Sequence, residues 1–185
     1  CPESLIGVTQ KIQLLAETGI DATLMLTFDE ALARLTAREF VEHVLVGALG
    51  VRTVLVGEDF RFGRGGAGDP ALLRDLGEEL GFRVDVVSDV RSLDADRRVS
   101  STWIRELLVD GDVECAAKLL GPTHAVWVEV VHGLKRGREL GFPTANVGVP
   151  GGMCMPADGV YAGWYERPDG QVYGCAINLG RRPTF

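Results

Sequence analysis

The chain has 185 residues, of which 46% are hydrophobic and 24% are charged, a composition typical of globular domains. Its formal net charge of −7 argues against general binding to nucleic acid. The sequence contains no run of 18 apolar residues and no basic start followed by an apolar core, so it predicts no membrane span and no signal peptide, and indicates a cytoplasmic protein.

Residues 1–121 alternate between helical and strand patterns. Helices are predicted at Thr9–Glu17, Thr36–Gly50, Asp69–Gly81, Ser100–Val109 and Asp112–Gly121, and strands at Ala22–Thr27, Thr53–Val56 and Arg83–Ser88. Thr9, a Thr36-Ala-Arg-Glu39 capping box, Asp69 before Pro70, Ser100 or Ser101, and Asp112 supply the helix starts. Strands that alternate with helices predict a doubly wound α/β domain with a parallel sheet, in which ligands bind beyond the carboxyl ends of the strands.

The pattern changes after Gly121. Alternating or extended segments at Ala125–His132, Ala145–Val149, Val160–Glu166 and Gln171–Asn178 predict strands, and Asp169-Gly170 predicts a hairpin turn. We therefore expect a domain boundary between residues 121 and 122, and an antiparallel barrel or sandwich over 122–185. Lys and Arg number 13 against 21 Asp and Glu in residues 1–121, and 6 against 5 in residues 122–185.

The four cysteines are scattered along the chain at Cys1, Cys115, Cys154 and Cys175. None belongs to a Cys-x-x-Cys pair, which argues against a zinc site and favours reduced thiols. A disulfide between Cys154 and Cys175 is left open.

Residues 133–146 read Gly-Leu-Lys-Arg-Gly-Arg-Glu-Leu-Gly-Phe-Pro-Thr-Ala-Asn. Glycines let backbone N–H groups approach an anion, and the three cations supply positive charge. Thr144 and Asn146 carry oxygen atoms that suit Mg²⁺. The stretch predicts a site for a nucleotide phosphate and its metal; the alternative is a basic surface turn between strands.

Two segments of the first part offer further candidate sites. In Gly57–Gly63, Phe60 and Phe62 could flank a planar ring and Asp59 could accept hydrogen bonds; alternatively, the rings plug the sheet edge and Asp59 satisfies a turn. In Val99–Arg105, three hydroxyls stand at a helix N-terminus, which favours an anion that Arg105 could bind. The alternative there is simple capping with Arg105 in solvent.

These motifs resemble those of known flavin-cofactor enzymes. Gly-x-x-Arg-Gly-Arg-x-Leu-Gly-Phe-Pro-Thr-Ala-Asn resembles the nucleotide-binding loop of riboflavin kinases. Gly-Glu-Asp-Phe-Arg-Phe-Gly followed by Val-Ser-Ser-Thr-x-Ile-Arg is similar to the adenylyltransferase module of bacterial FAD synthetases. The order matches the bacterial bifunctional riboflavin kinase/FMN adenylyltransferase family, over about Lys11 to Phe185. The resemblance implies a nucleotidyltransferase-like doubly wound domain at 1–121 and a kinase β-barrel at 122–185, both incomplete because the chain looks truncated at both ends.

The resemblance also implies the chemistry and the residues that perform it. Riboflavin would be phosphorylated to FMN with ATP and Mg²⁺, and FMN adenylated to FAD; homo-oligomerisation is left open. The implied kinase nucleotide site consists of Gly133, Arg136, Gly137, Gly141, Pro143, Thr144 and Asn146, with Thr144 and Asn146 on the metal. Asn178, Pro183 and Thr184 would lie near the flavin and phosphates. The implied adenylyltransferase nucleotide site consists of Asp59, Phe60, Ser100, Ser101, Thr102 and Arg105.

The sequence also departs from the family pattern. No His-containing nucleotide loop precedes the first helix, and His43, His124 and His132 are isolated, so we expect them to be structural or solvated. Leu134 stands where a polar residue is expected. The expected base for the riboflavin hydroxyl lies beyond Phe185, and no catalytic residue is identified. We therefore expect poor adenylyltransferase activity from this chain alone. A non-catalytic flavin- or nucleotide-binding regulatory protein and a monofunctional kinase are the alternatives.

Overall fold

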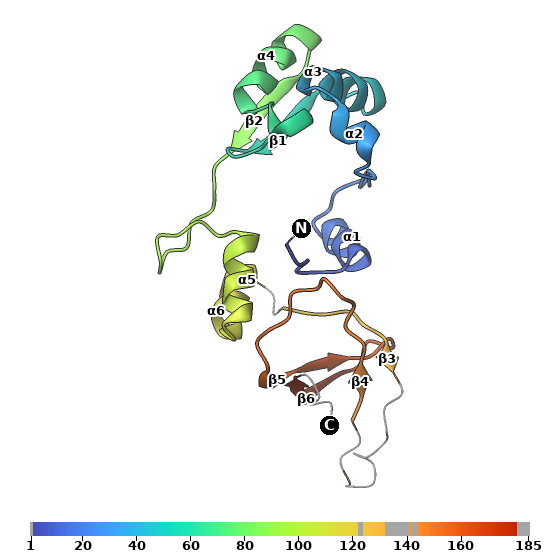
Figure 1. Cartoon of the computed structure of the whole chain (residues 1–185), viewed down its shortest axis with the longest axis vertical. Coiled ribbons are helices and arrows are strands. Elements are labelled where there is room, and N and C mark those ends of the chain that lie inside the picture. The colour runs from blue at the N-terminus through green and yellow to red at the C-terminus, as the bar shows by residue number, and fades with distance from the viewer. Residues whose placement is uncertain (1, 122–123, 132–140, 142–143, 181–185) are drawn as a thin grey trace. The chain divides into compact units, whose positions relative to one another are not determined.

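The computed structural model describes residues 2–121, 124–131, 141 and 144–180 (Figure 1). Contacts between residues divide the chain into two compact units, one of Leu24–Arg98 and one that joins Cys1–Thr23 to Val99–Phe185. Within the described residues, no helix is long and apolar enough to cross a membrane.

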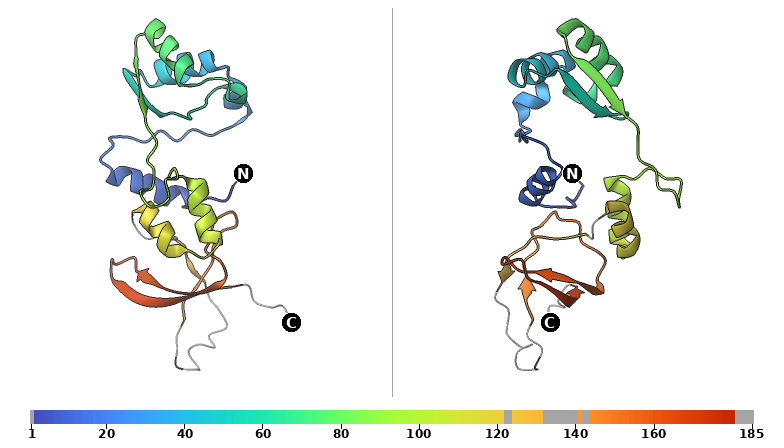
Figure 2. Two further views of the ribbon diagram at one scale, coloured as in Figure 1. Left: turned by 90° about the vertical axis from the view of Figure 1, so that its left-hand side faces the viewer. Right: turned by 180° about the vertical axis from the view of Figure 1, so that it is seen from behind.

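The unit Leu24–Arg98 contains a parallel pair of strands. Strand β1 (Thr53–Gly57) pairs with β2 (Arg83–Val87) in a register that runs from Thr53↔Arg83 to Gly57↔Val87. Helix α4 (Pro70–Leu80) lies in the connection between them (Figure 2). The strands expected at Thr53–Val56 and Arg83–Ser88 and their parallel direction are confirmed.

The helix starts of this unit follow the capping signals. Thr36 and Glu39 form the expected capping box, with Thr36 N–H donating to Glu39 Oε2 at 2.8 Å and Glu39 N–H donating to Thr36 Oγ1 at 3.2 Å. This box opens α3 (Ala37–Phe40), which continues as the π-helix η1 (Val41–Ala48). Asp69 accepts from Leu72 N–H at 2.8 Å and caps α4, which ends before Gly81 at φ 84°. Helix α2 (Glu30–Arg34) and the 3₁₀ turn η2 (Arg64–Gly66) were not predicted.

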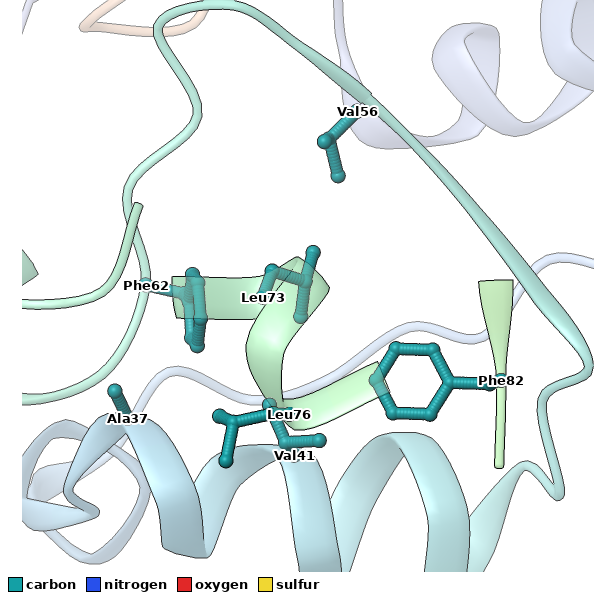
Figure 3. Packing of buried hydrophobic residues seen from close by; sticks show 7 residues of the cluster. All are labelled: Ala37, Val41, Val56, Phe62, Leu73, Leu76 and Phe82. Carbon is teal, nitrogen blue, oxygen red and sulfur yellow. The ribbon is translucent and has the colours of Figure 1, made fainter. Parts of the chain in front are cut away.

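The core of this unit lies between its helices and one face of the strand pair (Figure 3). Its buried members are Ala37, Val41, Val56, Phe62, Leu73, Leu76 and Phe82. On the opposite face of the strands, Leu55 is 67% exposed and Val87 is 52% exposed. The described helices of this unit therefore cover one face of the sheet, whereas a doubly wound sheet is covered on both.

The prediction of a strand at Ala22–Thr27 is wrong. Residues 22–29 have no regular structure, and Leu24, Met25 and Leu26 are exposed. A strand exists only when a neighbour accepts and donates its backbone hydrogen bonds, and no described strand pairs with this segment.

In its described residues, the other unit combines three helices with short antiparallel sheets. Its helices are α1 (Val8–Glu17), α5 (Ser101–Val109) and α6 (Val113–Leu120). Ser100 caps α5 and Asp112 caps α6, as predicted. Thr9 was predicted to cap α1, which is wrong: the N-cap is Gly7, two residues earlier, and its carbonyl accepts from Lys11 N–H at 2.9 Å.

Strand pairing in the second half is antiparallel. β5 (Gly159–Glu166) and β6 (Val172–Leu179) form the predicted hairpin, with Gly170 at φ 80° in its turn. β3 (Val130–Val131) and β4 (Asn146–Val147) pair over two residues each, much shorter than the predicted strands; His132 lies outside the described residues. Each sheet of the described chain has two strands, and none closes into a barrel.

Candidate functional site

The loop from Gly57 to Gly63 leaves the carboxyl end of β1. Phe60 N–H donates to the Gly57 carbonyl at 3.2 Å, which forms a tight turn with Asp59 near its apex. Arg98 Nη1 lies 2.7 Å from Asp59 Oδ2. The hydrogen bond from Arg98 is the largest cause that lowers the pKa of Asp59, so this carboxylate is ionised at neutral pH.

The two aromatic rings of this loop contact each other. Phe60 and Phe62 are stacked with centroids 5.5 Å apart and planes 18° apart, and Phe62 also lies 5.9 Å from Phe40. Phe62 is 6% exposed and belongs to the core. Phe62 therefore fills the core at the edge of the sheet, as the structural alternative for these rings proposed. Phe60 stacks on Phe62 and is only partly buried.

The second predicted segment begins α5. The Ser100 hydroxyl accepts from Trp103 N–H at 3.2 Å and so caps the helix. Ser101 and Thr102 are exposed in the first turn. Arg105 is not free in solvent, because its Nε donates to the Glu3 carbonyl at 2.6 Å.

The segment that receives Arg105 is itself held by backbone pairing. Ser4 N–H donates to the Gly152 carbonyl at 2.7 Å, and Cys154 N–H donates to the Ser4 carbonyl at 2.8 Å. Cys154 is 1% exposed and packs in a core with Ile104, Leu108 and Ala116. The start of α5 is thus joined to residues 152–154 through the N-terminal segment.

The two adenylyltransferase segments fall in different units. Asp59 and Phe60 belong to Leu24–Arg98, whereas Ser100, Ser101, Thr102 and Arg105 belong to the other unit. The structure therefore describes each segment separately.

The predicted kinase site is described in part. Gly141 has φ 78°, Thr144 is exposed, Asn146 is half-buried in β4 opposite Val131, and Asn178 is exposed in β6. Gly133, Arg136, Gly137, Pro143, Pro183 and Thr184 lie outside the described residues. The described part of the chain contains no group of three or more His, Cys, Asp or Glu that could hold a metal. The predicted magnesium ligands are instead a hydroxyl and an amide oxygen, which are hard donors of the type that Mg²⁺ accepts.

Sequence reasoning missed a shallow groove and one cation. The groove, of ≈ 490 Å³, is lined by Thr9, Trp127, Val128, Glu129, Val131, Gly148 and Pro150. The period-two spacing of Trp127, Glu129 and Val131 was the available signal, since such residues share a face of a strand. The missed cation is Arg98, whose signal was its place two residues before Ser100.

The histidines and cysteines make no reactive cluster among the described residues. His43 is exposed on η1, and His124 Nε2 lies 3.1 Å from the Leu5 carbonyl. Cys115, Cys154 and Cys175 are free thiols, which removes the disulfide left open between Cys154 and Cys175.

Comparison with known proteins matches two family models to successive parts of the chain. The FAD synthetase family model matches residues 1–103, and the riboflavin kinase family model matches residues 120–185. The chain is 42% identical to the bifunctional riboflavin kinase/FMN adenylyltransferase of Escherichia coli K12 over 99% of its own length and 58% of the relative. It is 35% identical to the enzyme of the same name from Bacillus subtilis, over 100% and 57% of the two chains.

A solved structure shares the fold. A crystal structure described as a macrolide-efflux protein from Streptococcus pneumoniae superposes with a TM-score of 0.85 at 31% identity, covering 98% of this chain and 57% of that one. The chain spans about 58% of the length of the curated relative from E. coli. The family model that covers residues 1–103, more than half of the 185 residues, shows that the chain belongs to the FAD synthetase family.

Proposed function

We propose that the protein phosphorylates riboflavin to FMN with ATP and then adenylates FMN to FAD, releasing pyrophosphate. The observation that carries this proposal is the order of the two family matches, FAD synthetase at 1–103 and riboflavin kinase at 120–185. It is supported by relatives that bear both activities in their name and align over nearly the whole chain.

The two activities belong to two modules in this proposal, at 1–121 and 122–185. The parallel pair β1–β2 would form part of a doubly wound sheet, and the hairpin β5–β6 part of an antiparallel barrel. The switch from parallel to antiparallel pairing along the chain supports this division.

In adenylation, an FMN phosphate oxygen attacks the α-phosphorus of ATP, and the bond to pyrophosphate breaks. Asp59, as an ionised acceptor, and the partly buried ring of Phe60 would orient a nucleotide at the end of β1. Ser101 and Thr102 would donate from the first turn of α5, where backbone N–H groups and the helix dipole favour phosphate. Ser100 serves as the cap of that turn, and Arg105 would bind a phosphate oxygen through its guanidinium.

In phosphorylation, the riboflavin 5′-hydroxyl attacks the γ-phosphorus of ATP and ADP leaves. The glycines Gly133, Gly137 and Gly141, with Arg136 and Pro143, would wrap the nucleotide phosphates. Thr144 and Asn146 would hold Mg²⁺, which neutralises phosphate charge when it is bound. Asn178, Pro183 and Thr184 would orient the flavin beside the phosphates.

The experiment is incubation of the full-length natural protein with riboflavin and Mg-ATP, followed by chromatography of the flavins. Asn146→Ala should abolish FMN formation and spare adenylation of added FMN. Val147→Ala, the neighbour on β4, is the matched control and should keep both activities.

Adenylation is tested separately with Arg105→Ala, which should weaken the use of ATP in FAD formation and leave phosphorylation intact. Lys118→Ala on α6 is its control. Equal loss of both activities in either variant would contradict the two-module proposal. Binding of flavin and nucleotide without any product would instead indicate the regulatory alternative.

A further inference from the structure

We infer that Arg98 is a positioning residue for adenylation: its guanidinium holds the Asp59 carboxylate and thereby fixes the loop that follows β1. This inference rests on the proposed adenylyltransferase function for its consequence, but its geometry lies entirely within Leu24–Arg98.

A reversal of the chain after β2 brings Arg98 to this loop. Arg91 and Arg98 form an antiparallel bridge, and Ser92 N–H donates to the Arg97 carbonyl at 2.9 Å. Arg91 closes the turn by donating from Nη2 to the Asp96 carbonyl at 2.6 Å, with Asp96 at φ 44°. The turn returns the chain to the sheet edge that it has just left.

Arg98 meets two carboxylates at that edge. Its Nη1 lies 2.7 Å from Asp59 Oδ2, and its Nε lies 3.1 Å from Asp89 Oδ1. Asp59 follows the end of β1 by two residues and Asp89 follows the end of β2 by two residues, and these strand ends are partners in the parallel register. Two like charges at neighbouring strand ends repel each other, so a cation between them stabilises both loops.

Backbone hydrogen bonds hold the two ends of this loop, and the contact of Arg98 with Asp59 holds its middle. Gly57 belongs to β1, and Phe62 exchanges backbone hydrogen bonds with Gly68 at 3.2 and 2.9 Å. Between these anchors the Asp59 side chain is 63% exposed and is held by Arg98. The pair engages Oδ2, which leaves lone pairs of the carboxylate for a ligand donor.

The pKa values agree with this geometry. The hydrogen bond between the two side chains is the largest cause both of the lowered pKa of Asp59 and of the raised pKa of Arg98. The guanidinium therefore stabilises the ionised form of Asp59.

The test uses Arg98→Ala and Arg98→Lys in the full-length protein, with Arg74→Ala, which removes an exposed cation on α4 of the same unit, as the matched control. Arg98→Ala should lower kcat/KM for FAD formation by about 10- to 100-fold, because small displacements of a positioning group are costly. Arg98→Lys should restore part of the loss, since it keeps the charge without the forked geometry. Phosphorylation of riboflavin should not change, and Arg74→Ala should resemble the wild type in both reactions.

A double variant of Asp59 and Arg98 distinguishes a positioning role of Arg98 from a general loss of stability. If Arg98 acts through Asp59, the double variant Asp59→Asn/Arg98→Ala should be no worse in FAD formation than Asp59→Asn alone. Additive losses would overturn the inference, as would wild-type kinetics of Arg98→Ala in an active protein.

Amide hydrogen exchange of residues 58–61 gives a readout that needs no activity. Exchange should be faster in Arg98→Ala than in Arg74→Ala. If the wild type forms no FAD but this difference in exchange is seen, the proposed adenylation is refuted, while the inference that Arg98 holds the loop is supported. If the two variants exchange at equal rates, the inference that Arg98 holds the loop is refuted, whether or not the protein forms FAD.

Discussion

Gly63 ends the candidate loop at a position that should accept no side chain. Its backbone has φ 71° and ψ 177°, a region that is essentially confined to glycine. A Cβ there would lie 2.5 Å from the Ala37 nitrogen and 2.6 Å from the Ala37 Cα, at the first turn of α3. We therefore predict that Gly63→Ala strongly destabilises the unit Leu24–Arg98.

The magnitude follows from two costs. The backbone conformation costs an alanine about 1–3 kcal/mol, and forcing a methyl group against a packed backbone adds about 1–3 kcal/mol. Gly65→Ala is the control: Gly65 also has a positive φ, 67°, but apart from Gly65 and its two chain neighbours no atom of the described residues lies within 4 Å of the position that its Cβ would take. That variant should lose only about 1–2 kcal/mol.

The assay must report on the correct unit. The three tryptophans, Trp103, Trp127 and Trp164, and the three tyrosines all lie outside residues 24–98, so their fluorescence does not follow this unfolding. Native-state amide exchange of buried Val56 and Leu73 does. If Gly63→Ala changes their exchange free energy no more than Gly65→Ala does, the steric reasoning is refuted.

Three further predictions concern capping, acid stability and thiol reactivity. Thr36→Ala removes the capping box and should cost about 1 kcal/mol, measured by urea unfolding followed by far-ultraviolet circular dichroism; an unchanged midpoint would contradict it. Hydrogen bonding to Arg38 lowers the pKa of Glu79 from its ordinary 4.5, so the associated stabilisation is complete above that value and is lost as pH falls through the lowered pKa. In Glu79→Gln the free energy of unfolding should therefore fall less steeply as the pH is lowered than it does in the wild type. An unchanged dependence on pH would argue against a stabilising pair of Arg38 and Glu79. Burial raises the pKa of the Cys154 thiol, so iodoacetamide should modify Cys154 more slowly than the less buried Cys115 and Cys175, as peptide mass spectrometry would show; equal rates would contradict its burial.

Elements with strong local signals could be predicted from the sequence. The Thr36–Glu39 box, Asp69 with Pro70, Ser100 and Asp112 start the helices they were expected to start. Asp169-Gly170 forms the expected hairpin. In each case the stabilising hydrogen bonds join residues within one or two turns of the chain, so neighbouring residues suffice to specify them.

Features that depend on distant partners could not be predicted in this way. The apolar pattern of Ala22–Thr27 resembles that of β1, yet of these two segments only β1 has a parallel neighbour in the described chain. The alternation of Ala125–His132 likewise predicted a longer strand than the two-residue pairing of β3. Apolar periodicity shows that a segment suits a strand, whereas hydrogen bonding to another strand decides whether one forms.

The motif residues show the same limit at the level of the candidate site. The sequence by itself determined which segments carry the family motifs and where the local caps and turns fall. Only the tertiary structure decided that Phe62 is a core residue, that Arg105 donates to Glu3, and that Arg98 lies against Asp59. These contacts join residues separated by tens of positions, and chain reversal and packing, rather than local sequence, bring such residues together.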